Sequence, residues 1–404
     1  NFVETLNLFI NASKIVGLIN YCCVIESGLL YRNVKSTYQL FLELIRMFVY
    51  LIITYHLIFN VGLRYIMCHF NIIKYWTIFI AARISEKWMM KFINGIIEFD
   101  RKLFFFNSYY SVKVYSISKR FWMISFASFI LFFMYCQIFI FQLQGKQIYD
   151  FSLYSKFLFH SPDIINFVVM ITSLYYLSNL GYRFCELNRL WKCLPFGLIT
   201  LPGGLTSSEI IIIMLVERIR LLHAELSELL RLFSLGYGPV LLMYFTFSFA
   251  HALIDTFFFT VYRELLRKDY FPFIFYPIHI LEMISIIYVT SWVIEEKRRI
   301  ISYLRLNRIS KMSIDIKLQI KTFMHQISVY EPNEFTAFGF FNLDLRLTMP
   351  VNLSIIDCWH LYYDTNERPP LDIKKSLISK FNTYTGFGSS GYHKKERFLS
   401  TYIL

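Results

Sequence analysis

Six apolar stretches recur along the chain, and most are long enough to cross a lipid bilayer as a helix, which takes roughly 20 apolar residues. They run over residues 40–63, 70–84, 121–143, 164–184, 237–262 and 271–293. The second is short and carries Lys74 and Arg83 near its ends, but long basic side chains near a helix end can reach the membrane interface. The pattern predicts an all-α polytopic membrane protein with six to seven transmembrane helices.

The lysines and arginines between these stretches fall on alternate connections. Residues 83–120 hold eight of them, residues 183–231 hold six, and residues 297–321 hold eight. The intervening connections hold only Lys146 and Lys156 in one, and Arg263, Arg267 and Lys268 in the other. Because loops rich in basic residues stay in the cytosol, we expect a cytosolic N-terminus.

Composition agrees with a membrane protein and excludes other classes. The chain is 56% hydrophobic, 17% charged and carries a formal net charge of +13, with a mean hydropathy of +0.46. That positive charge belongs to the inner loops, whereas a nucleic-acid partner needs it on one folded basic face, so we expect no nucleic acid. The seven cysteines show no paired-ligand spacing, and no nucleophile motif or phosphate loop is present. We therefore expect no enzyme activity, no metal and no cofactor.

Two segments outside the predicted spans have helical periodicity. Apolar residues recur at three- and four-residue steps over 216–233 and again over 316–330, where Ser313 is a plausible N-cap. Both segments are cytosolic in this topology, so we expect them to pack into one helical bundle below the membrane. The alternative is that they lie on lipid headgroups. We interpret His223, near Glu225 and Glu228, as part of a solvated charged face.

Several segments carry a resemblance to one family. The run IRLLHAELSELLRLFSLGYGPVLLMYFTFSFAHALIDTFF over 219–258 resembles the fifth-helix signature of insect gustatory receptors, with His223, Leu226 and a glycine-containing junction before the membrane entry. Shorter matches keep the family's order: GLLYR at 28–32, FDRKL at 99–103, LNRL at 187–190 and FTAFGFFNLDLRL at 335–347. The resemblance covers roughly residues 10–347, and we take 1–347 as one transmembrane domain.

The resemblance implies a subunit of a ligand-gated, non-selective cation channel that small tastants open. Four such subunits, alike or related, would surround one pore in the lipid of the plasma membrane of sensory neurons. The last helix would line that pore, and the cytosolic helix ends would form the anchor that joins the subunits.

The chain departs from the family after Leu347. The family continues into a pore helix with a Thr-Tyr pair followed at fixed spacing by Gln-Phe, whereas residues 348–397 are polar and rich in proline, glycine and serine. Residues 398–404 read FLSTYIL, so Thr401 and Tyr402 would open that signature. Either an unspliced segment is translated, or this is a non-conducting product without its pore helix. The chain also begins at Asn1 rather than at methionine, so we expect it to be incomplete.

Polar groups inside the spans are the candidate ligand-binding residues, since burying an ionisable group at mid-bilayer costs on the order of 3 kcal/mol. Ser248, His251 and Asp255 share one face of the fifth span and could line a hydrated cavity, or else His251 and Asp255 satisfy each other or a neighbouring helix. The other candidates are Tyr55, His56, Tyr75, Trp76, Tyr135, Gln137, Tyr175 and Tyr176. These aromatic and polar side chains suit small organic ligands, but any single tyrosine could equally pack or form an interface belt.

Two other classes remain as alternatives. A G-protein-coupled receptor also has seven helices, and Asp100-Arg101 resembles its Asp-Arg pair, but the pair follows the second span here and the charge bias places the N-terminus inside. A membrane transporter or enzyme would need internal symmetry or a catalytic motif, and the sequence shows neither.

Overall fold

The computed structural model describes residues 2–20, 23–26, 29–32, 37–61, 66–110, 119–144, 164–192, 207–261, 272–306 and 314–330. Within these ranges the chain forms eight helices and one two-stranded antiparallel sheet. The helices are α1 (Phe2–Val16), α2 (Thr37–Val61), α3 (Ile66–Tyr110), α4 (Lys119–Gln144), α6 (Ile164–Lys192), α7 (Ser207–Val261), α9 (Pro272–Leu306) and α10 (Ile314–Tyr330). The strands are β1 (Cys23–Glu26) and β2 (Leu29–Arg32).

The six predicted spans fall on α2, α3, α4, α6, α7 and α9. Three stretches of these helices, Thr37–Tyr55, Ile164–Lys192 and Ile212–Ile254, are long and apolar enough to cross a membrane. The all-α prediction therefore holds for the described residues, apart from the short hairpin β1–β2. The polar segment 348–397 and Thr401 and Tyr402 lie outside the described residues.

Helices α2 and α4 present apolar side chains outward, as lipid-facing helices do. Phe41 and Phe48 on α2, and Leu131 on α4, are more than half exposed. Exposed apolar surface of this extent on a soluble protein would be an aggregation site. In a bilayer it is the surface that lipid chains cover.

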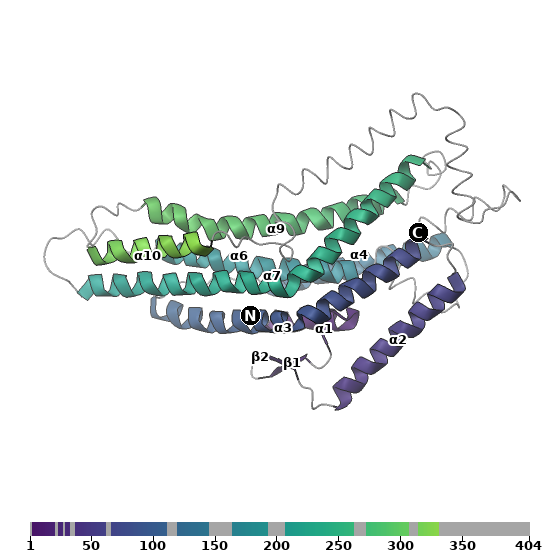
Figure 1. The fold of residues 1–404 in the computed structure, drawn as a ribbon, viewed down its shortest axis with the longest axis horizontal. Helices are drawn as coiled ribbons and strands as arrows, with labels where there is room; N and C mark the ends of the chain where they lie inside the picture. The colour runs from purple at the N-terminus through teal and green to yellow at the C-terminus, as the bar shows by residue number, and fades with distance from the viewer. Residues whose placement is uncertain are drawn as a thin grey trace, which may run out of the picture.

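Helices α3 and α7 are much longer than a bilayer requires. They hold 45 and 55 residues, or about 70 and 80 Å at 1.5 Å per residue, whereas the hydrocarbon core is about 30 Å thick. Figure 1 shows α7 changing direction near its middle, and Pro239 lies inside the helix, where it removes a backbone N–H and bends the axis. Both helices are therefore long enough to cross a bilayer and to continue well beyond it.

Close packing holds α3 against α7. The Phe92 and Phe233 rings lie 5.2 Å apart and edge to face, and both side chains are fully buried. At Gly236 an added Cβ would lie 2.8 Å from the backbone N of Met89. The two backbones therefore approach at a point that only glycine permits.

The two amphipathic segments, in the first part of α7 and in α10, pack into one bundle, as we predicted from their periodicity. The apolar stripes of α7 and α10 are buried at Val216, Ile219, Leu222, Leu226, Leu229, Leu230 and Phe233, and at Ile316, Ile320, Phe323 and Ile327. Arg220 on α7 donates to Gln326 Oε1 on α10 at 2.6 Å, and Gln326 donates back to the Arg220 carbonyl at 3.2 Å. Helix α10 therefore packs on protein rather than lying alone on headgroups.

The interpretation of His223 as a solvated residue is wrong. Its side chain is 1% exposed and lies between the rings of Phe184 and Phe323, at 5.6 and 5.5 Å. Its Nε2 faces the carbonyl of Lys297 at 3.5 Å. Helices α6, α9 and α10 cover this face of α7, because His223 follows Ile219 by four residues and so shares the apolar stripe.

Asp100 belongs to the Asp100-Arg101 pair that resembles the Asp-Arg pair of G-protein-coupled receptors. In the structure Asp100 forms an ion pair between helices. Arg183 on α6 donates from Nε to Asp100 Oδ1 at 2.7 Å and from Nη2 to Oδ2 at 2.5 Å. This bidentate geometry is the strong form of an arginine–carboxylate contact. It ties the cytosolic part of α3 to the end of α6.

Helix α1 is tied to the inner ends of the spans by the turn that ends it. Gly17 has a φ of 90°, and the amide N–H of Leu18 donates to the Ser13 carbonyl at 2.8 Å, the pattern of a Schellman cap. The Gly17 carbonyl accepts a hydrogen bond from Arg83 Nη2 on α3 at 2.9 Å. Arg83 also pairs with Glu43 on α2 at 3.0 Å, so one guanidinium joins three segments.

The close approach at Gly236 predicts an unequal pair of glycine substitutions. Gly236→Ala should lower the free energy of unfolding by about 1–3 kcal/mol, since backbone must move to admit the methyl group. Gly95→Ala, on the same interface, meets only the Cδ2 methyl of Leu229 at 2.4 Å, which can turn aside. Thermal unfolding of the purified chain in detergent measures both, and equal losses would contradict this account of the interface.

Candidate functional site

A buried polar contact joins α3 and α7 within the second and fifth predicted spans. His251 Nε2 donates to Asn71 Oδ1 at 3.2 Å, and both side chains are buried. The Phe70 ring lies 5.8 Å from the His251 ring and 5.2 Å from the Phe247 ring. A polar pair walled by aromatic rings offers both stacking surface and hydrogen bonds.

Ser248 places a hydroxyl group on the same face of α7 as His251, and in the described part of the chain this group has no hydrogen-bond partner. It precedes His251 by three residues and so shares its helix face, and its side chain is buried. Its hydroxyl has no hydrogen-bond partner among the described residues. A buried hydroxyl without a partner costs about 1–3 kcal/mol, which a bound ligand or water would recover. We call Asn71, Ser248 and His251 the outer polar cluster.

We call the cluster outer because we expect it to lie in the outer half of the bilayer, given the orientation that the basic loops predict. His251 lies 14 residues from the predicted inner end of its span at 237, and Asn71 lies 13 from the inner end at 84. At 1.5 Å per residue both are about 20 Å from the inner edge of a core about 30 Å thick. The two helices run in opposite directions, and both residues are predicted to lie in the outer half of the bilayer.

A second polar contact links α7 to α9. Tyr244 donates from its hydroxyl to Glu282 Oε2 at 3.3 Å, and it precedes His251 by seven residues, two turns along the same face. The polar face of α7 therefore meets both α3 and α9.

The tyrosines of the fourth span lie elsewhere, in the packed interior. Tyr175 stacks on Phe9 with ring centroids 4.0 Å apart, and its hydroxyl lies 2.7 Å from Thr5 Oγ1. Tyr176 packs between Phe92 and Tyr237 at 5.6 and 6.0 Å. Both are completely buried, and they join α6 to α1, α3 and α7.

The aromatic pair of the second span makes contacts between helices. Tyr75 donates to the Val16 carbonyl at 3.2 Å, and Trp76 donates from Nε1 to Thr54 Oγ1 at 3.1 Å. These bonds link α3 to the end of α1 and to α2. The structure does not bring either residue to the outer polar cluster.

The remaining candidates are separate from this cluster or lie outside the described side chains. Tyr55 and Tyr135 are 63% and 65% exposed, on the outward surfaces of α2 and α4. The side chains of His56, Gln137 and Asp255 lie outside the described ones. Of the predicted residues, the structure therefore groups Ser248 and His251, and their ligand-binding role stays a prediction.

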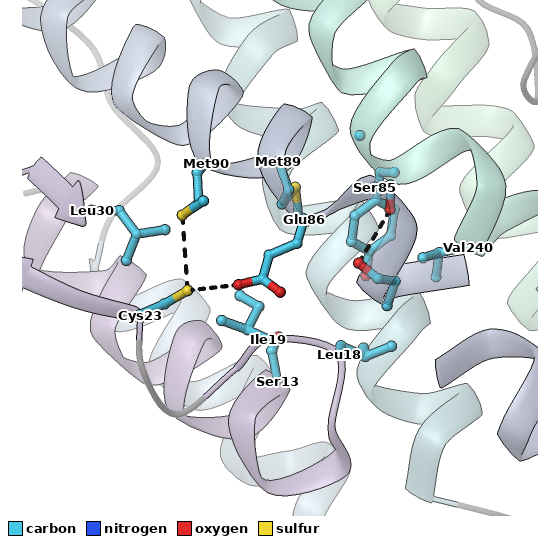
Figure 2. Close-up of a pocket in the computed structure, with 13 residues that line it drawn as sticks. Ser13, Leu18, Ile19, Cys23, Leu30, Ser85, Glu86, Met89, Met90 and Val240 are labelled. Carbon is cyan, nitrogen blue, oxygen red and sulfur yellow. Dashed lines mark hydrogen bonds between the residues drawn. The ribbon is translucent and has the colours of Figure 1, made fainter. Parts of the chain in front are cut away.

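A small cavity lies between the hairpin, the turn after α1 and the middle of α3 (Figure 2), and it is too small for such a ligand. Its volume is about 20 Å³, enough for one water molecule, whereas ligand sites are hundreds of cubic ångströms. Figure 2 shows the Cys23 thiol directed at Glu86, to which it donates at 3.2 Å, with Met90 Sδ 3.9 Å away. Burial, with Glu86 beside it, raises the pKa of Cys23 to about 12, so the thiol stays protonated.

Asn71 is not among the residues predicted from the sequence. A signal was present, because an amide inside an apolar span requires a partner. Its partner His251 comes 180 residues later along the chain, and that pairing is a property of the fold.

Comparison with known protein families matches residues 6–351 to the 7tm chemosensory receptor family. The match extends over most of the chain, so the chain belongs to this family, and the family resemblance read from the sequence is confirmed at that level. The chain is therefore a multi-pass membrane chemoreceptor. A search of curated proteins gave no match.

The contact between Asn71 and His251 predicts energetic coupling. Asn71→Leu and His251→Phe should each lower the unfolding temperature of the purified chain, because each breaks a buried hydrogen bond. The double variant should lose less than the sum of the two, with a coupling of about 0.5–3 kcal/mol in a double-mutant cycle. Additive losses would mean that the two side chains do not interact.

Proposed function

We propose that the chain is a gustatory receptor subunit of a ligand-gated, non-selective cation channel in the plasma membrane of sensory neurons, opened by a small tastant. The outer polar cluster binds the tastant from the extracellular side. The observation that carries this proposal is the buried Ser248 hydroxyl, which has no hydrogen-bond partner among the described residues and lies three residues before His251 on the same helix face.

The chemistry of the cluster defines the class of ligand. Phe70 and Phe247 supply apolar surface, while Ser248 and His251 can each offer one hydrogen bond. This combination suits a small, neutral organic molecule with one or two polar groups. A strongly charged ligand would bind weakly, because removing its charge from water into a buried site costs free energy.

Opening requires that the ligand bind the open arrangement more tightly than the closed one. Helix α7 is the route, because one continuous helix runs from the outer polar cluster past Pro239 into the cytosolic bundle. The ion pair of Lys102 on α3 with Glu225 on α7, at 2.8 Å, continues the α3–α7 contact below the membrane. A tilt of the outer part of α7 would therefore be transmitted to the helix ends that we propose join the subunits of a tetramer.

The test of the proposal is current. The chain should be expressed both as it stands and with residues 348–395 replaced by a complete family pore helix. We expect cation current on application of taste compounds from the restored form, and silence from the original if the pore helix is absent. G-protein signalling without current in the restored form would refute the channel assignment.

Ser248→Ala tests the site within the same experiment. Loss of one hydrogen bond to the ligand, worth about 1 kcal/mol, should raise the half-maximal ligand concentration about fivefold with little change in maximal current. Thr246→Val is the matched control, since it removes a hydroxyl from an exposed position two residues away. An equal shift in both variants would rule out Ser248 as a ligand contact.

A further inference from the structure

A groove with basic walls lies between the β-hairpin and α3. It has a volume of about 450 Å³ and is open to the surface. Arg32 on β2 lines one side and Lys87 and Lys91 on α3 line the other, and all three side chains are exposed. In Figure 1 the hairpin lies on the side of α3 opposite to α7, so the groove faces away from the helical bundle.

The shape of the groove is fixed, because hydrogen bonds hold the hairpin against α3. The Leu30 amide donates to Asn94 Oδ1 at 2.7 Å, and Asn94 Nδ2 donates to the Leu30 carbonyl at 2.9 Å. Asn94 thus pairs with β2 as a neighbouring strand would. Because side chains alternate along a strand, Arg32 projects to the same side as the buried Leu30 and so toward α3.

Depth places the groove at the inner leaflet. Lys87 and Lys91 follow the predicted inner end of the second span at Ile84 by three and seven residues, or about 4.5 and 10 Å along the helix. The polar headgroup layer occupies about 5–7 Å on each side of the hydrocarbon core. Trp88, over which Lys91 Nζ lies 4.8 Å from the ring centroid, is partly exposed at the same level, as interfacial tryptophans are.

The only acidic side chain among the residues that line the groove is at its far end. Glu98 follows Lys91 by two helical turns, away from the membrane, and it faces Lys102 at 3.5 Å. The end nearest the bilayer therefore carries three positive charges, from Arg32, Lys87 and Lys91.

We propose that this groove binds the headgroup of a polyphosphorylated anionic lipid of the inner leaflet, of the phosphoinositide class. Lys87 lies at the level of the lipid phosphodiester, while Lys91 and Arg32 lie where phosphates on the headgroup ring project into the cytosol. Clustered basic side chains at this depth are the chemistry that recognises such headgroups. The bound lipid would fix the hairpin and α3 to the membrane surface.

The proposal is tested with the full chain in phosphatidylcholine nanodiscs and a fluorescent short-chain phosphatidylinositol bisphosphate as the probe. Lys87→Gln/Lys91→Gln should weaken binding about 10- to 30-fold, since each basic residue near the surface contributes about a factor of five. The matched control is Lys317→Gln/Lys321→Gln, which removes the same charge at the same spacing on α10. It should bind as the unmodified chain does.

Two further arms make the outcome decisive. Inositol trisphosphate should compete much more weakly than the lipid, and equal competition would overturn the lipid source in favour of a free cytosolic anion. Equal loss of binding in the groove and α10 variants would overturn the site itself. Thermal unfolding of each variant, measured alongside, shows whether a loss of binding comes from loss of folding.

Discussion

The close packing of α3 on α7 is the constraint on which the rest of the structure depends. Both helices are far longer than the bilayer is thick, and at Gly236 their backbones approach so closely that a methyl group would meet the main chain of Met89. The outer polar cluster and the cytosolic bundle are therefore two ends of one packed unit.

Polar contacts recur at three levels along this unit, in the order that the predicted orientation gives them. Within the predicted spans, His251 and Asn71 share a hydrogen bond across the α3–α7 interface, since polar groups without access to water need protein partners. At the inner leaflet, Arg83 joins α1, α2 and α3, and the basic groove lies just beyond. In the cytosol, Asp100 and Arg183 join α3 to α6. Ligand, lipid and partner subunits would thus act at separate depths on the same helices.

Much of this architecture could be predicted from the sequence, because it follows from local patterns. The six apolar stretches all lie on helices, three of which are long and apolar enough to cross a membrane, and three- and four-residue periodicity predicts the buried stripes of α7 and α10. The errors have physical causes. His223 was assigned to its charged neighbours, although its spacing from Ile219 and Leu226 puts it on the buried stripe. The four-residue strands of the hairpin are too short for an alternating pattern, and the partner of Asn71 depends on a helix pairing that no local pattern contains.

The account rests most directly on the orientation of the chain, since every depth assigned above reverses if the N-terminus is outside. Labelling of single cysteines in intact cells with a membrane-impermeant maleimide measures it, with accessible native cysteines replaced by serine. Leu318→Cys, at an exposed position on α10, should be labelled only after permeabilisation, and Lys146→Cys, in the sparsely charged third connection, should be labelled in intact cells. The reverse pattern would contradict the orientation and, with it, the placement of the ligand site and the lipid groove.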